Sequence, residues 1–250
     1  MAGQLASTLF NKDPDPELSI VVHDVSERTI TRFLSSHAAL FPGRKIVPAS
    51  SPAGVARLAS TIVTMLPSSP EVRQVYTAED GVLGGLTDLR GDGPAQPEHS
   101  TLLLDATTCD PATSLDVAKL IRSAGVLETV AGAQDGVGAG AFEFLDTPVS
   151  GGVVGARAGT LSFMVGADSA LSFARAEPTL LTMGARAIHC GKNSVSSSSV
   201  GTLSTLTLPD NSLTAHLSLP STVSQSGLIA KLCNNLLLGI SMIGVSQLLA

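Results

Sequence analysis

Short apolar runs alternate with helix-like segments through the first half of the chain. Ser19–Val22 is a compact β-branched run, and residues 26–41 after it have the pattern of a helix. The alternation continues with a strand at Lys45–Pro48, a helix at Pro52–Leu58, a strand at 61–66, a helix at 70–76, a strand at Thr101–Asp105 and a helix at 111–124. Strands that alternate with helices predict an α/β fold with a parallel sheet covered on both faces.

Two stretches interrupt this alternation. Residues 129–140 are rich in Gly and Ala, and residues 193–224 are dominated by Ser and Thr and contain Pro209 and Pro220. We expect both to be loops or insertions. Because a structureless connection of about 30 residues is rare inside a compact domain, the second stretch is either a flexible excursion or sequence that an untrimmed gene prediction retained, and we favour the latter.

The charge balance argues against one class of partner. The chain has a formal net charge of −6 and 15 Lys and Arg residues, whereas a nucleic-acid surface needs clustered positive charge. The cysteines lie far apart and form no CxxC pair, which indicates neither a disulfide framework nor a zinc site: Cys109, Cys190 and Cys233. A reducing compartment fits them best, and we expect no nucleic-acid partner and no metal.

The C-terminal stretch of residues 236–250 is apolar. It is shorter than the roughly 20 residues that a membrane-spanning helix requires, and it includes Gly239, Ser241 and Gln247. We therefore expect a buried helix here and no membrane partner. The first ten residues have helical character and show no targeting segment.

A glycine pair follows a strand end in residues 146–165, which read DTPVSGGVVGARAGTLSFMV. The backbone amides of Gly151 and Gly152 are unhindered, and together with the Ser150 hydroxyl they can form a concave set of donors. Such a set suits a carboxylate, which accepts several directed hydrogen bonds. The plain alternative is a glycine-rich turn without a ligand.

Lys231 stands in the otherwise apolar run 227–238, with Asn234 and Asn235 three and four residues later on the same helical face. If this lysine is buried, desolvation lowers its pKa, which suits proton exchange near neutral pH. The alternative is a lysine at a helix start whose aliphatic side chain is buried while its amine stays in contact with water.

At this point a family resemblance becomes specific. DTPVSGGVVGARAGTLSFMVG resembles the substrate-binding signature of the β-hydroxyacid dehydrogenases, and KLCNNLLLGISMIG is similar to the catalytic-lysine helix of that family. With IVTMLPSSPEV and LLLDATTCDPATS the likeness spans most of the chain, and within the family it is closest to the 3-hydroxyisobutyrate dehydrogenases. The resemblance implies hydride transfer from a small 3-hydroxy acid to NAD, which gives the semialdehyde.

The resemblance also implies roles for individual residues. Lys231 takes the place of the family's proton-exchanging lysine, and Asn235 orients the substrate. The positions that hold the substrate carboxylate are Ser150, Gly151 and Gly152, and Thr108 falls beside both the nicotinamide and the substrate.

Cofactor positions follow from the same likeness. The three residues of the MLP motif match a segment that lines the cofactor cleft in relatives, although a buried strand end explains them equally well: Met65, Leu66 and Pro67. Asp24 follows the first visible strand, where a carboxylate accepts hydrogen bonds from ribose hydroxyls and repels a 2′-phosphate. This favours NAD over NADP, although Arg28 nearby weakens the preference.

The chain departs from the family pattern at its start. Relatives begin with a strand and a GxGxxG turn that binds the cofactor pyrophosphate, whereas MAGQLASTLF is similar to the helix after that turn, with Ala2 at the third glycine. We therefore place Met1 and Ala2 in the cofactor site. We expect an incomplete, doubly wound Rossmann-type sheet that lacks its first strand and is followed by the start of a long interdomain helix.

These expectations divide the chain into three parts: a partial dinucleotide-binding domain at 1–191, a Ser/Thr-rich insertion at 192–225, and at 226–250 the start of the interdomain helix of a missing helical domain. For the full-length form the resemblance implies a homo-oligomer. It also implies a mitochondrial location; without it, the composition fits the cytoplasm.

Other functions stay open at this point. A tartronate semialdehyde (2-hydroxy-3-oxopropionate) or glyoxylate reductase is a related alternative, whereas a phosphogluconate dehydrogenase is disfavoured because that family has His where Asn234 stands. A non-catalytic remnant of the family is an alternative of a different class, and the missing phosphate-binding turn favours it.

Overall fold

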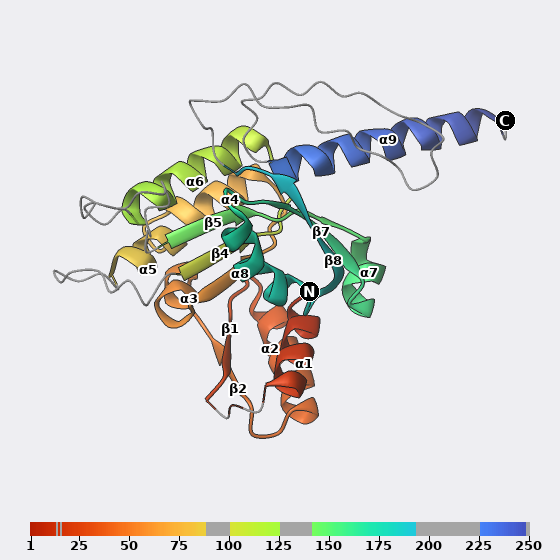
Figure 1. The fold of residues 1–250 in the computed structure, drawn as a ribbon. Helices are drawn as coiled ribbons and strands as arrows, with labels where there is room; N and C mark the ends of the chain where they lie inside the picture. The colour runs from red at the N-terminus through yellow and green to blue at the C-terminus, as the bar shows by residue number, and fades with distance from the viewer. Residues whose placement is uncertain (14, 16, 89–100, 126–141, 194–225, 249–250) are drawn as a thin grey trace.

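The computed structural model describes residues 1–13, 15, 17–88, 101–125, 142–193 and 226–248 (Figure 1). The strands are β1 (Ser19–Val22), β2 (Lys45–Pro48), β3 (Thr61–Thr64), β4 (Thr101–Asp105), β5 (Phe142–Asp146), β6 (Val149–Ser150), β7 (Leu161–Gly166) and β8 (Gly184–Gly191). The helices are α1 (Ala2–Lys12), α2 (Glu27–Leu40), α3 (Pro52–Leu58), α4 (Ser69–Thr77), α5 (Val82–Asp88), α6 (Pro111–Gly125), α7 (Gly152–Ala158), α8 (Ala170–Leu180) and α9 (Ser226–Leu248). The expected loop at 129–140 and most of the Ser/Thr-rich stretch lie outside the described residues.

Local sequence signals account for most of these boundaries. β1, β2, β4 and α3 lie where the hydrophobic pattern predicted them. β3 ends at Thr64, two residues early, because the Leu66 N–H donates to Thr107 Oγ1 instead of continuing the ladder. At the start of α2, the Ser26 side chain accepts a hydrogen bond from the Thr29 N–H, which satisfies a donor that a helix start leaves unpaired.

The main sheet is mixed: the parallel pairing expected from the alternation holds for β3 and β4, and antiparallel strands follow further along the chain. β3, β4 and β5 are parallel neighbours, whereas β7 is antiparallel to β5 and β6 and parallel to β8. Only residues 151–160 join β6 to β7, and parallel neighbours need a crossover of a dozen or more residues. The short connection therefore imposes the antiparallel pairing.

β1 and β2 form a separate parallel ladder, and among the described strands neither is hydrogen-bonded to the main sheet. The α/β class and the Rossmann-type arrangement predicted from the sequence are confirmed.

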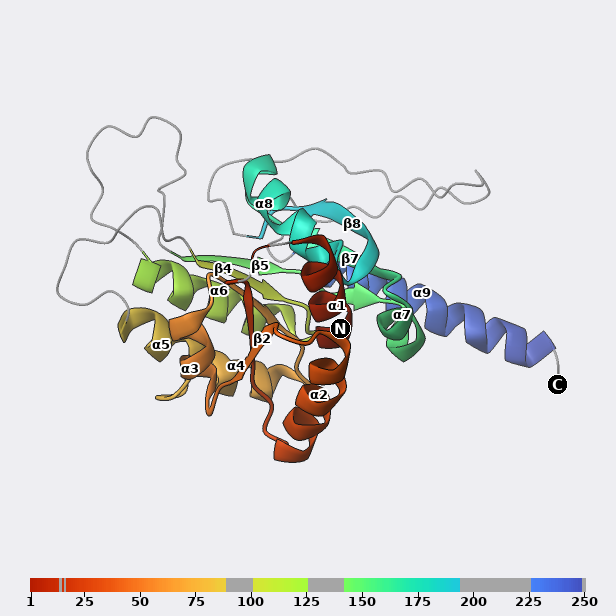
Figure 2. The same ribbon diagram turned by 90° about the horizontal axis from the view of Figure 1, so that it is seen from below.

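Helices cover both faces of the main sheet (Figure 2). α4, α5 and α6 lie on one face and α8 on the other. Alternate strand residues enter the two layers, as the pleat of a strand requires: Leu103 and Phe144 join the core under α4 to α6, whereas Leu104 and Leu145 join the core under α8. The sequence pattern thus fixes which side chains face each helix layer.

α9 leaves the body of the protein and extends outward to the C-terminus (Figure 1). Its first turn is anchored, because Leu228 is 1% exposed in the core under α4 to α6. Leu236, Leu237 and Leu238 are 65%, 54% and 53% exposed, so the expectation of a buried helix was wrong for these residues. Among the described residues, no helix is both long and apolar enough to span a membrane.

Candidate active site

A cavity of about 540 Å³ lies beyond the carboxyl ends of β3 and β4, next to the first residues of α1. Its volume is in the range of small-molecule sites, and the crevice beyond the strand ends is where open α/β sheets bind ligands. The lining residues are Met1, Ala2, Met65, Thr108, Val149, Gly151, Gly152, Val153, Ala156, Leu161 and Lys231.

The glycine turn forms one wall of this cavity. β6 ends at Ser150, and α7 starts at Gly152 directly after Gly151. Both glycines have positive φ, 128° at Gly151 and 59° at Gly152, a backbone conformation that L side chains rarely adopt. Apart from its chain neighbours and the backbone of its own helix, no described atom lies within 4 Å of where a Gly152 Cβ would stand, so a ligand can approach this backbone closely.

Lys231 lines the same cavity from α9. Its side chain is buried, at 8% exposure, and this burial lowers the pKa of the ammonium. The roles that the family resemblance implies would place this lysine and the glycine turn at one substrate. In the structure Lys231, Gly151 and Gly152 line the same cavity.

The start of α1 and two strand ends supply further predicted lining residues. Met1 and Ala2 stand at the N-terminus of α1, whose first turn holds no acidic residue. Met65 directly follows β3, and Thr108 lies three residues after β4. A helix N-terminus favours anions through its partial positive charge and free N–H groups, so this side of the cavity can receive a negatively charged group.

Other predicted site residues are not among those that line the cavity in the described part of the chain. Ser150 is half-buried on β6, where it pairs with Ser162 of β7. Asp24 is exposed and accepts a hydrogen bond from the Ser26 N–H. The remaining three are Leu66, which packs against the core, and Pro67 and Asn235, which are exposed.

The sequence analysis missed the apolar wall of the cavity. Its members are Val149, Val153, Ala156 and Leu161. They flank the glycine pair within the same long segment, so their position beside that pair was the available signal. An apolar wall excludes water, which strengthens the electrostatic interactions of Lys231 with a bound ligand.

Two buried carboxylates at the end of the sheet were also missed. Asp105 and Asp146 end β4 and β5, are neighbours in register, and are each 1% exposed. Asp105 accepts hydrogen bonds from the Thr64 hydroxyl at 2.9 Å and the Thr107 N–H at 3.1 Å. Burial raises the pKa of Asp105 to about 6 and that of Asp146 to about 7, and the charge of Asp105 adds to the rise at Asp146. An acidic residue that closes an apolar strand was the signal in the sequence.

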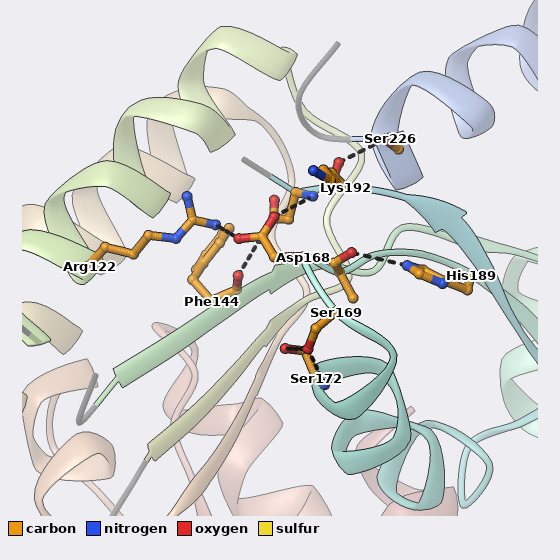
Figure 3. Close-up of polar contacts among 10 residues, drawn as sticks. Arg122, Phe144, Asp168, Ser169, Ser172, His189, Lys192 and Ser226 are labelled. Atoms are coloured by element: carbon orange, nitrogen blue, oxygen red, sulfur yellow. Dashed lines mark hydrogen bonds and ion pairs between the residues drawn. The ribbon is translucent and has the colours of Figure 1, made fainter. Parts of the chain in front are cut away.

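Lys192, just after β8, and Ser226, the first residue of α9, lie side by side (Figure 3). The Lys192 carbonyl accepts hydrogen bonds from the Ser226 N–H at 3.2 Å and the Ser226 hydroxyl at 2.7 Å. Asp168 accepts from the Asn193 N–H at 3.0 Å and pairs with Arg122 at 2.9 Å. The start of α9 is thus fixed next to the end of β8.

We expect that residues 194–225 can be replaced by three glycines without loss of the fold. The described residues on either side already meet, and a connection about tenfold shorter lowers the entropic cost of closure by on the order of 2 kcal/mol. The free energy of unfolding, measured by urea denaturation, should therefore stay equal or rise. Loss of cooperative unfolding would show that the replaced residues belong to the folded unit.

Comparison with known proteins places the chain in a family. The family described as the NAD-binding domain of 6-phosphogluconate dehydrogenase matches residues 1–141 and 127–191. The chain belongs to this family. The NAD-binding fold predicted from the sequence is confirmed by this match.

Individual relatives carry the name that the motifs predicted. The probable mitochondrial 3-hydroxyisobutyrate dehydrogenase of Dictyostelium discoideum is 35% identical over 247 residues, which cover 99% of this chain and 55% of that protein. The mitochondrial 3-hydroxyisobutyrate dehydrogenase of Mus musculus is 35% identical over 199 residues, with 80% and 42% covered. The chain thus spans about half the length of the curated relatives it matches.

Solved structures agree with this family. The Mycobacterium tuberculosis 3-hydroxyisobutyrate dehydrogenase with L-serine is similar with a TM-score of 0.63 at 25% identity, over 99% of this chain and 60% of that one. A structure described as Psf3 in complex with NADP+ and 2-OPP shares the fold with a TM-score of 0.59 at 17% identity, over 99% and 65%.

The cavity fits the nicotinamide end of the cofactor that the family implies. Its apolar wall can receive a flat ring, the open space at Gly152 admits a ligand to the backbone, and the start of α1 offers N–H groups to a phosphate. Asp24, the predicted ribose contact, lies on the separate β1–β2 side and outside the cavity lining among the described residues.

Proposed function

We propose that this chain is the NAD-binding and lysine-bearing part of a dehydrogenase that oxidises a small 3-hydroxy acid, of the 3-hydroxyisobutyrate kind, to its semialdehyde. One observation carries the proposal: the buried amine of Lys231 and the glycine turn at Gly151 and Gly152 line the same cavity. A substrate with a carboxylate at one end and a hydroxyl two carbons away can reach both groups at once.

In this proposal each predicted substrate-site residue has a defined role. The amides of Gly151 and Gly152, with the Ser150 hydroxyl, hold the substrate carboxylate. The neutral amine of Lys231 accepts the proton of the substrate hydroxyl as the carbonyl forms, which its lowered pKa favours near neutral pH. NAD, when bound, would supply the acceptor for the hydride that leaves the hydroxyl-bearing carbon. Asn235, one turn beyond Lys231 on α9, orients the substrate.

The same proposal assigns residues to cofactor binding. Residues at the start of α1 and after β3 and β4 hold the nicotinamide end: Met1, Ala2, Met65, Leu66, Pro67 and Thr108. Asp24 holds the adenosine ribose and favours NAD over NADP. For the whole protein we propose self-association and, from the mitochondrial relatives, a mitochondrial location.

The deciding experiment combines binding and turnover. NADH binding is measured by the change in nicotinamide fluorescence, and the whole protein is assayed for NAD reduction with 3-hydroxyisobutyrate and for NADH oxidation with glyoxylate and tartronate semialdehyde. We expect binding and the highest kcat/KM with 3-hydroxyisobutyrate. A preference for the other two substrates would make the protein a reductase of the same superfamily, and absence of NADH binding would make it a non-catalytic remnant.

Asp24→Ala is expected to reduce the preference for NAD over NADP by about tenfold, the effect of losing one hydrogen bond to a charged group. The measurement is the ratio of the two cofactor Kd values in the whole protein. Glu27→Ala, which removes a nearby exposed carboxylate at the start of α2, is the matched control and should leave the ratio unchanged. Equal ratios in the parent and both variants would remove Asp24 from cofactor recognition.

A further inference from the structure

The first three backbone N–H groups of α9 are bound by acceptors from other elements. The Ser226 N–H donates to the Lys192 carbonyl, which Figure 3 shows at the base of α9. The N–H groups of Gly227 and Leu228 donate to Asp146, the latter to Oδ2 at 2.7 Å. A helix start leaves its first N–H groups without partners inside the helix, so these contacts dock α9 on the sheet.

The packing around Asp146 leaves little freedom to this contact. A Cβ on Gly166, the register partner of Asp146 on β7, would stand 2.0 Å from Asp146 Oδ1. A Cβ on Gly227 would stand 2.3 Å from the Met164 carbonyl oxygen and 2.8 Å from Asp146 Oδ2. Glycines on both sides therefore let the carboxylate, β7 and the first turn of α9 meet at close range.

Burying the Asp146 carboxylate costs free energy unless it accepts hydrogen bonds. Asp146 is 1% exposed, and its Oδ1 has no hydrogen-bond partner among the described residues. Its Oδ2 faces the N-terminus of α9, where the helix dipole favours negative charge. The neighbouring Asp105 is equally buried but bonds Thr64 and Thr107. Asp146 is thus the buried acid of this pair that connects the sheet to α9.

Asp146 also stands close in sequence to one wall of the cavity and close in space to the other. Ser150, where the glycine turn begins, is four residues after it. Lys231 is three residues after Leu228, a rise of about 4.5 Å along the helix. The Asp146 side chain therefore connects β5, which precedes the glycine turn, to α9, which carries Lys231.

We propose that Asp146 is a positioning residue: by accepting hydrogen bonds from the first turn of α9, it holds Lys231 in the cavity opposite Gly151 and Gly152. The assignment of a catalytic task to Lys231 rests on the proposed function, but the docking of α9 does not. Asp146 is not among the residues that line the cavity in the described part of the chain, so it acts through α9 and not on the substrate.

The test is the pKa of Lys231, measured without substrate or cofactor. The pH dependence of trace acetylation is followed lysine by lysine with mass spectrometry; the chain has five lysines, and Lys231→Arg identifies the relevant peptide. Asp146→Ala removes the acceptor and should raise the pKa of Lys231 by about one unit, because the amine then reaches water. Asp105→Ala, the matched control on β4, should leave that pKa unchanged.

A conservative variant keeps the test decisive if Asp146→Ala does not fold. Asp146→Asn retains an oxygen that can accept the Leu228 N–H, but a neutral acceptor forms a weaker bond than a carboxylate, so a smaller rise in the pKa of Lys231 is expected than in Asp146→Ala. This rise must exceed that in Asp105→Asn. Equal values in the two asparagine variants would overturn the proposal. Because the readout needs no turnover, a protein that lacks dehydrogenase activity would overturn the proposed function and leave this inference standing.

Discussion

Lys231→Ala in the whole protein is expected to lower kcat for oxidation of the 3-hydroxy acid by about 10²- to 10⁴-fold, the usual contribution of a positioned general base. The Kd for NADH should change little, because the proposed partner of Lys231 in the cavity is the substrate hydroxyl and not the cofactor. Steady-state kinetics and nicotinamide fluorescence measure the two quantities separately.

Lys192→Ala is the matched control for this substitution. Lys192 is an exposed lysine at the base of α9, and its contact with Ser226 uses the backbone carbonyl, which alanine retains. We expect near-parental kcat for this variant. A Lys231→Ala protein that turns over as fast as the Lys192→Ala protein would exclude Lys231 from proton exchange.

Asp105→Asn is expected to flatten the pH dependence of stability in mildly acidic solution. Burial raises the pKa of Asp105 from 3.8 to about 6, so between these values the folded protein retains a proton that the unfolded chain releases. The stability associated with Asp105 is therefore fully present below about pH 4 and is lost as the pH rises through about 6. A shift of about two units corresponds to roughly 3 kcal/mol.

The measurement is the free energy of unfolding in urea from pH 4 to pH 7. The asparagine can still accept the hydrogen bonds of Thr64 and Thr107 through its oxygen, but it does not titrate. Asp88→Asn removes the same charge from an exposed ion pair with Arg57, which contributes little to stability, and should leave the slope near that of the parent. Parallel profiles for the parent and Asp105→Asn would contradict a titrating Asp105.

Much of the fold was accessible from the sequence because its signals are local. The alternation of short apolar runs with helix-like segments predicted β1, β2, β4 and α3 at their observed bounds. The antiparallel pairing of β7 was not accessible, because it depends on how short the connection through α7 is and not on the composition of the strand. Likewise, the apolar sequence of Leu236 to Leu238 resembles a buried helix, whereas their exposure depends on which elements lie nearby.

The candidate site was likewise only partly predictable from the sequence. The glycine turn and Lys231 were predicted, because each belongs to a long motif whose chemistry is readable from a few residues. Their meeting in one cavity, and the placement of Asn235 outside its lining among the described residues, are properties of tertiary packing. Asp146 was overlooked as a separate contributor because its partner is the Leu228 backbone, 82 residues away, and a backbone N–H leaves no trace in sequence.

The contacts that hold the first turn of α9 on the sheet affect how the protein can be assembled from fragments. Asp146, the Lys192 carbonyl and the buried Leu228 side chain hold the helix start through contacts between described residues on either side of residues 194–225. We therefore expect a polypeptide of residues 226–250 to associate with a separately made fragment that ends at residue 193. Lys231 would then be supplied in trans, and variants of its helix could be exchanged on an unaltered sheet.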